Sequence, residues 1–254
     1  MHNASIIYKK FIDLKRLNFI WENLKAHGVP EGGKILDVGC GNGNISIYLG
    51  NQGYQVLGID ISEKTILKAR SLNTLDNVTF KVSSAEELGK RNELFDAIVC
   101  SEVLEHLKDP DIILSHVGRL LKDDGILLVT VPNGFGPREL LVTRPVQYLK
   151  RKDNVIWRSL KSVKKAFGYD GQTKQTDADD LEHLQFFTLN KLHAMSTQHK
   201  FKIEKIGKSN FIEDVFPISM LSKKSLWLQK FDCKIADILP RPFTGGFNMV
   251  WVKK

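Results

Sequence analysis

Two acidic side chains and a histidine lie close together in the string "SEVLEHL", residues 101–107. Glu102, Glu105 and His106 are spaced so that one helical turn would place them on a single face. Two carboxylates held so close repel each other unless one is protonated or a cation lies between them. A second histidine, His183, comes just before a later helical pattern, where the chain re-enters the core. We expect these four side chains to converge.

Three explanations stay open for this set. Glu105 and His106 could serve only to fix a loop, with His106 bonded to the backbone. His106 or His183 could act as a general base that removes a proton from a substrate. The four side chains could instead hold a metal ion, and a mixed set of carboxylates and imidazoles suits zinc, manganese or iron better than magnesium.

A glycine-rich stretch, "KILDVGCGNGNIS" at residues 34–46, indicates a second site. Gly39, Gly41 and Gly43 follow an apolar run and precede a helical pattern, so a ligand could lie against bare backbone at a helix N-terminus. An acid, Asp60, ends the next apolar run about 20 residues later. The glycine fingerprint of dinucleotide-binding enzymes is missing its third glycine, which disfavours a dehydrogenase.

Short β-branched runs alternate with helix-length segments along the first half of the chain. The runs are "KILDV", "QVLGID", "VTFKV", "FDAIVC" and "GILLVTV", and the intervening helices are expected at 43–52, 62–73, 84–90 and 109–122. Such alternation predicts βαβ units and a parallel sheet buried on both faces. Two later strands, at 201–207 and in "FNMVWVKK", suggest an antiparallel edge. The predicted fold is a Rossmann-like α/β fold with a seven-stranded, mostly parallel sheet and an inserted lid.

The 254 residues read as a single domain. We expect an N-terminal helix within 1–30, a ligand-binding core at 31–133, a basic insertion at 134–182, and the remainder of the core at 183–254. A further helix is expected at 188–198 and another through 222–235. Ser62 and Asp109 are good helix-start residues.

Composition narrows the possible compartments and partners. No apolar run approaches the roughly 20 residues that span a bilayer, and the first residues lack the apolar core of a signal peptide. The three cysteines have no metal-type spacing and suit reduced thiols, so we expect a cytoplasmic protein. A net charge of +8 permits an anionic partner but is also compatible with ordinary solubility.

Four segments taken together resemble the class I S-adenosylmethionine-dependent methyltransferases. They are "ILDVGCGNG", "VLGIDIS", "FDAIVCSEVLEHL" and "LLKDDGILLVTVPN", and the resemblance covers residues 34–133. It implies an enzyme that binds S-adenosylmethionine and releases S-adenosylhomocysteine.

The resemblance also implies a cofactor-binding set. Asp60 would accept both ribose hydroxyls, Asp37 would lie near the cationic amino end, and Ile61 would lie on one face of the adenine. Gly39 and Gly41 would let the methionyl part lie on the backbone. The remaining members are the neighbouring Cys40, Ser84 with the backbone of Ala85 near the adenine amino group, Ser101, and Arg16, which would reach the cofactor carboxylate.

The Glu-x-x-Glu-His string with a later histidine resembles two subgroups. These are the ubiquinone-biosynthesis O-methyltransferases, with related type 11 and type 23 methyltransferase domains, and the small-RNA 3′-terminal 2′-O-methyltransferases, whose metal site uses these residue types. "KRLNFIWENL", residues 15–24, also resembles the ubiquinone group. The resemblance implies O-methylation of a small hydroxylated, lipid-like molecule, with Glu102, His106 and His183 as catalytic residues. An RNA 2′-O-methyltransferase and a non-catalytic nucleotide-binding module are the alternatives.

The insertion is rich in lysine and arginine between residues 138 and 167, with interleaved aromatic residues. Its place after the fifth strand, beside the expected substrate mouth, favours a lid. The same composition could let the protein lie on a membrane surface or contact RNA. The sequence does not indicate the oligomeric state.

Overall fold

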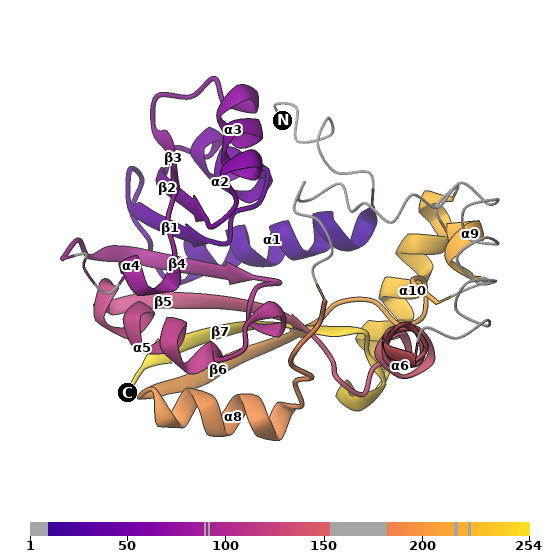
Figure 1. Cartoon of the computed structure of the whole chain (residues 1–254). Helices are drawn as coiled ribbons and strands as arrows, with labels where there is room; N and C mark the ends of the chain where they lie inside the picture. Colours follow the sequence, from indigo (N-terminus) through magenta and orange to yellow (C-terminus); the bar gives the residue numbers. More distant parts are fainter. Residues whose placement is uncertain (1–9, 89, 91, 153–181, 216–217, 223–224) are drawn as a thin grey trace.

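A seven-stranded sheet forms the centre of the protein in a computed structural model (Figure 1). The structure describes residues 10–88, 90, 92–152, 182–215, 218–222 and 225–254. The strand order is β3-β2-β1-β4-β5-β7-β6. The strands are β1 Lys34–Val38, β2 Gln55–Asp60, β3 Val78–Val82, β4 Phe95–Ser101, β5 Leu121–Pro132, β6 Phe201–Lys208 and β7 Gly246–Lys253.

The pairing confirms the expected mostly parallel sheet. Strands β1 to β5 pair in parallel, and β7 is antiparallel to both of its neighbours, β5 and β6. The antiparallel strand is therefore inserted one position inside the edge. All parallel strands end at the same edge of the sheet, which is where ligands bind in open α/β folds.

The helices cover both faces of the sheet. They are α1 Phe11–Ala26, α2 Asn44–Asn51, α3 Glu63–Leu72, α4 Ala85–Leu88, α5 Pro110–Leu120, α6 Arg144–Lys152, α8 Leu189–Gln198, α9 Ile218–Ser222 and α10 Leu226–Ile238. Three short turns accompany them, η2 Leu104–His106, the π-helical η3 Glu139–Thr143 and η4 Arg241–Phe243. Ser62 caps α3 and Asp109 caps α5, as expected.

Each face of the sheet has its own apolar core. One core packs α1, α2 and α3 against residues such as Ile35 and Val99. The other core packs α4, α5 and α8 against the residues that follow these two in their strands, Leu36 and Cys100 among them. Figure 1 shows these two sets of helices on opposite sides of the sheet. Because successive strand residues are buried on opposite faces, the strands read as continuous apolar runs.

Some expected boundaries differ from the structure. The helix expected through 222–235 begins only at Leu226, because the Ser225 side chain caps it by accepting the Leu228 N–H, and it extends to Ile238. Strand β5 begins at Leu121, which pairs with Phe95 across a register irregularity, rather than at the expected "GILLVTV". The N-terminal helix begins at Phe11, and residues 1–9 lie outside the described part.

The insertion leaves the sheet at the carboxyl end of β5. Its described part contains η3 and α6, while residues 153–181, most of the expected lid, lie outside the described residues. The chain returns beside its own exit, where Phe187 bridges to Asn133 and accepts a hydrogen bond from the Gly134 N–H at 2.7 Å. None of the described helices is both long enough and apolar enough to cross a membrane.

The glycine loop should tolerate a side chain poorly at its last glycine. Gly43 has a φ of +79°, and an added Cβ would meet the Phe80 ring. Gly43→Ala should therefore lower the free energy of unfolding by about 2–4 kcal/mol, from backbone strain and overpacking together. Gly53→Ala is the matched control, since its φ is +92° but the nearest atom would be Glu31 Cγ at 3.6 Å. It should cost about 1 kcal/mol in the same denaturant titration. Equal losses in the two variants would contradict the packing argument.

Candidate active site

The glycine loop connects β1 to α2 through three left-handed positions. Gly39, Gly41 and Gly43 have φ values of 66°, 54° and 79°, a region that glycine adopts at little cost. Asn42, between them, is buried, and its side-chain oxygen has no hydrogen-bond partner among the described residues. A buried oxygen without a donor is costly. The loop therefore has a built acceptor that a ligand could satisfy.

Asp60, at the end of β2, links this loop to the next one. One carboxylate oxygen accepts the Gly41 N–H at 3.0 Å, and the other accepts the Ser62 N–H at 2.9 Å. Each oxygen keeps a lone pair for a further donor. The following residue, Ile61, is 74% exposed, which is unusual for a large apolar side chain beside a buried strand. The ribose contact of Asp60 and the adenine contact of Ile61 stay predictions.

Asp37, at the end of β1, is almost fully buried. Its carboxylate accepts a hydrogen bond from the Ser46 hydroxyl at 2.6 Å. Burial raises the pKa of Asp37 to about 7; the Ser46 hydrogen bond opposes this rise and the charge of Asp60 adds to it. A cation placed beside Asp37 would favour its ionised form.

The expected adenine-side residue Ser84 has another role in the structure. Its hydroxyl accepts the Glu87 N–H at 3.3 Å, while the Glu87 carboxylate accepts the Ser84 N–H at 3.1 Å. This reciprocal pair is a capping box at the start of α4, whose first residue is Ala85. The hydroxyl of Ser84 is thus engaged in starting a helix, and the adenine contact stays a prediction.

The other expected cofactor residues lie around the same edge. Cys40 is buried, which raises its thiol pKa far above the usual range, and its N–H is bonded to Ile59. Ser101 ends β4 and shares a hydrogen bond of 2.9 Å with the Thr130 hydroxyl of β5. Arg16, on α1, reaches the same edge, where its Nη2 lies 3.4 Å from Glu102 Oε2. We call the region around Glu102, Glu105, His106 and His183 the mouth.

The helical turn expected to carry Glu102, Glu105 and His106 together is not formed. Only Leu104–His106 form a 3-10 turn, and Glu102 precedes it with a left-handed φ of 56°. The Glu102 N–H bonds to the Thr130 carbonyl at 2.9 Å, and its carboxylate accepts the Thr130 hydroxyl at 3.0 Å. The side chain of Glu102 is therefore held by Thr130 and Arg16, and it is not in the group of possible metal ligands that Glu105, His106 and His183 form.

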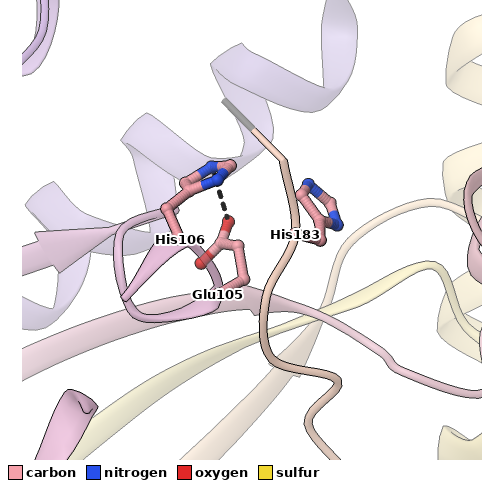
Figure 2. Close-up of side chains that lie close together, drawn as sticks. All are labelled: Glu105, His106 and His183. Carbon is pink, nitrogen blue, oxygen red and sulfur yellow. Dashed lines mark ion pairs between the residues drawn. The ribbon is translucent and has the colours of Figure 1, made fainter. Parts of the chain in front are cut away.

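Glu105, His106 and His183 do converge (Figure 2). One possible ligand atom from each lies within 4.8 Å of the others. The two imidazole rings lie edge to face with centroids 5.1 Å apart, and His106 Nε2 is 3.8 Å from Glu105 Oε1. Figure 2 shows His183 on the returning segment, beside the turn that carries the other two.

Backbone hydrogen bonds hold the returning segment against this turn. The Glu105 carbonyl accepts the N–H groups of Leu184 at 2.7 Å and Gln185 at 3.0 Å. In addition, His106 Nδ1 lies 3.0 Å from the Glu182 carbonyl oxygen. A carbonyl can only accept, so Nδ1 carries the proton and the other nitrogen, Nε2, has a free lone pair when the ring is neutral.

The charges of the cluster depend on its burial. Burial raises the pKa of Glu105 well above its usual range, and the nearby charge of Glu102 raises it further. The Oε2 atom of Glu105 is buried without a hydrogen-bond partner among the described residues. Burial lowers the pKa of His106, with a smaller opposing effect from the Glu182 carbonyl. A neutral imidazole beside this carboxyl group can accept a proton or bind a cation.

Two residues at the mouth were not singled out from the sequence. Thr130 anchors Glu102, and its position at the end of β5 was the available signal. Glu139 is fully buried next to His183 and comes from the insertion. Its signal was weak, since it is a single acid at the start of an insertion rich in lysine and arginine.

Several curated proteins are similar to part of this chain. The ubiquinone biosynthesis O-methyltransferase of Xanthomonas axonopodis pv. citri (strain 306) is 35% identical over 133 residues, which are 51% of this chain and 56% of the relative. That of Glaesserella parasuis serovar 5 (strain SH0165) is 33% identical over 144 residues, 54% of this chain and 60% of the relative. The chain thus spans a little over half the length of these relatives.

Solved structures share the fold at low identity. Magnesium protoporphyrin IX methyltransferase from Synechocystis PCC 6803, with bound SAH, has a TM-score of 0.55 at 18% identity, covering 96% of this chain and 84% of that one. A SAM-dependent methyltransferase from Methanosarcina mazei has a TM-score of 0.54 at 21% identity, covering 91% and 96%.

A family model gives the assignment. The model described as "Methyltransferase domain" matches residues 11–206, from α1 into β6, which is more than half of the chain. This match covers the glycine loop, Asp60 and the Glu105–His106–His183 cluster. It confirms the class I fold and the family expected from the sequence, whose cofactor is S-adenosylmethionine. The chain belongs to the methyltransferase domain family.

Proposed function

We propose that this protein transfers a methyl group from S-adenosylmethionine to a hydroxyl oxygen of a small, lipid-like molecule. The observation that carries the proposal is the cluster of Glu105, His106 and His183 at the carboxyl edge of the sheet, next to the glycine loop. A hydroxyl nucleophile must lose its proton, and this cluster offers a neutral imidazole for that purpose. The names of the curated relatives support transfer to oxygen.

The residues of the glycine loop fit the cofactor. Asp60 has acceptor capacity left for the ribose hydroxyls, and Asp37 is a buried acid for the cationic amino end. The Asn42 side-chain oxygen, which has no partner among the described residues, could accept a hydrogen bond from the ligand, and the exposed Ile61 offers an apolar surface for the adenine. When bound there, the cofactor supplies a methyl group already activated by its sulfonium charge. The chain's own task is positioning and the exclusion of water.

His106 is the residue that we propose to take the hydroxyl proton. Its Nδ1 is held by the Glu182 carbonyl, so its Nε2 is the basic atom. The lowered pKa keeps the imidazole neutral at physiological pH, as a general base requires. Glu102 lies beside Arg16, whose Nη2 is 3.4 Å from Glu102 Oε2.

The same cluster also fits a divalent cation. Glu105 Oε2 has no hydrogen-bond partner in the part of the chain that the structure describes, and a cation would stabilise the buried carboxylate. Glu105, His106 and His183 would be the ligands, with Glu102 close enough to raise the pKa of Glu105 by its charge. Such a donor set suits zinc, manganese or iron, and a bound ion would lower the pKa of the substrate hydroxyl.

Asp60→Ala should weaken cofactor binding. The variant removes two charge-assisted hydrogen bonds to the ribose, each contributing about 1.5–3 kcal/mol. Calorimetric titration with S-adenosylhomocysteine should show affinity reduced by about tenfold or more, with unchanged circular dichroism. The control is Asp124→Ala, an exposed aspartate near the start of β5, which should bind normally. Unchanged affinity in Asp60→Ala would contradict the ribose assignment.

Binding of S-adenosylhomocysteine should depend on pH through Asp37. Below a pH of about 7 the carboxyl of the empty protein holds a proton, and the ammonium of the ligand favours the ionised form. Binding therefore releases a proton, so affinity should fall by up to about tenfold per pH unit below 7 and level off above it. Asp37→Asn should bind more weakly and lose this dependence. A pH dependence that persists in Asp37→Asn would show that another group titrates.

The acceptor class can be tested directly with isotopically labelled S-adenosylmethionine. The panel should hold phenols with and without alkyl chains, aliphatic alcohols, and a short RNA with a free 3′ end. Labelled ether should form on the small hydroxylated molecules, with a preference for alkylated ones. Label on RNA alone would exclude the proposed substrate class.

His106→Ala and a chelator separate the two versions of the chemistry. If His106 is a plain base, the variant should lose about 10²–10⁴ in transfer rate, and chelator should have no effect. If the cluster binds a metal, chelator should abolish transfer while S-adenosylhomocysteine still binds, and Mn²⁺ or Zn²⁺ should restore it. The control is His193→Ala, on the exposed side of α8. Full activity in both tests would contradict both versions.

A further inference from the structure

The insertion supplies a buried acid to the mouth. Glu139 is the first residue of η3, and its side chain is 1% exposed. Glu139 Oε1 lies 3.3 Å from His183 Nδ1 and accepts the Thr143 hydroxyl at 3.2 Å. A π-helical turn is rare and is frequently found at functional sites. Here it places a carboxylate from the insertion against a residue that follows the insertion.

Stability alone does not explain this burial. The second carboxylate oxygen of Glu139 has no hydrogen-bond partner among the described residues. A buried and partly satisfied carboxylate is more costly than an apolar side chain of the same size. The contact with His183 gives a reason for placing an acid there.

Both histidines of the mouth have an acceptor beside Nδ1, although among the described residues only that of His106 makes a hydrogen bond. His106 Nδ1 faces the Glu182 carbonyl oxygen at 3.0 Å, and His183 Nδ1 faces the Glu139 carboxylate. Both partners are acceptors, so each favours a proton on Nδ1 and a lone pair on the other ring nitrogen. Histidines that bind metals or act in catalysis commonly donate one ring N–H to a carboxylate or a carbonyl, which fixes their tautomer.

We propose that Glu139 is a positioning residue that fixes His183 in the Nδ1–H tautomer, so that Nε2 is the atom available to a proton or cation at the mouth. The inference rests on the proposed function of this cluster. Glu139 Oε1 and His183 Nδ1 lie 3.3 Å apart, but the contact does not meet the geometry of a hydrogen bond. Such contacts often tighten when substrate binds.

The remainder of this region supports a fixed His183. The Gln147 side chain, on α6, donates to the His183 carbonyl at 3.1 Å. Arg144 donates to the Gly134 carbonyl at 2.7 Å, and its guanidinium lies 4.5 Å from the centre of the Phe186 ring. The described part of the insertion thus holds both the backbone and the ring of His183, by separate residues.

The experiment reads the tautomer without relying on activity. Protein with ¹⁵N-labelled histidine, treated with chelator, is studied by long-range ¹H–¹⁵N correlation at a pH of about 8, above the ordinary histidine pKa of about 6.5. The chain has seven histidines, and His183→Asn assigns the signals of His183. The native protein should show His183 protonated on Nδ1. Glu139→Leu should redistribute this proton between the two nitrogens.

Activity provides the second measurement. Glu139→Leu should lower the rate of methyl transfer by about 10–100-fold and leave the affinity for S-adenosylhomocysteine unchanged. If Glu139→Leu does not fold, Glu139→Gln keeps the side-chain volume and should show the same direction in both measurements. The matched control is Glu204→Gln, which removes a similar contact, 3.5 Å from His27, outside the mouth. It should change neither the His183 spectrum nor the rate.

Two outcomes would overturn the inference. One is a native protein in which His183 carries its proton on Nε2, and the other is a Glu139→Leu variant that keeps the native tautomer and rate. If native protein shows the Nδ1–H signature, lost in the variant, but transfers no methyl group to any acceptor, the pairing of Glu139 with His183 is supported and the proposed function fails.

Discussion

The carbonyl oxygen of Glu105 attaches the segment that carries His183 to the turn that carries His106. It accepts two N–H groups from the segment that follows the insertion, at Leu184 and Gln185. Because these bonds join backbone to backbone, they fix where His183 lies whatever the nearby side chains do. A displaced return segment would separate His183 from His106, and it would also remove the Glu182 carbonyl from the ring of His106. The parallel bridge between Asn133 and Phe187 supports the same attachment from the β5 side.

Several carboxyl groups lie around this attachment, and they differ in how many hydrogen-bond or ion-pair partners they have. Glu102 is paired with Arg16 and Thr130, whereas Glu105 and Glu139 each keep one oxygen without a partner among the described residues. Burial and mutual repulsion favour a proton or a cation on Glu105. The glycine loop is similar, because the Asn42 side-chain oxygen has no partner among the described residues and burial raises the pKa of Asp37. Unmet acceptors at both sites fit a protein whose ligands bring positive charge and donors.

Most of the fold could be predicted from the sequence because the apolar runs are short, β-branched and bounded by helix signals. β1, β2 and β3 have the expected bounds, and the three glycines of the glycine loop indicated a turn between β1 and α2. The convergence of His106 and His183 followed from chain order. Two features could not be read in this way. The left-handed backbone of Glu102 has no sequence signal, and Glu139 is a single acid beside a run rich in lysine and arginine. The capping box at Ser84 did have a signal, because Glu87 follows it three residues later.

The position of β7 imposes an order on how the sheet can assemble. β6 has β7 as its neighbour in the sheet, and β7 pairs with β5 through contacts such as Leu128 with Val250. β6 therefore cannot join the sheet before β7, although it precedes β7 in the chain. Pairing β5 with β7 closes a very long loop, which contains the insertion. The chain therefore loses the entropy of loop closure before the contacts between the two strands can offset that loss. In the half of the sheet that carries the glycine loop, the longest closure joins β1 to β4 across residues 39–94, whereas the closure between β5 and β7 spans residues 133–245.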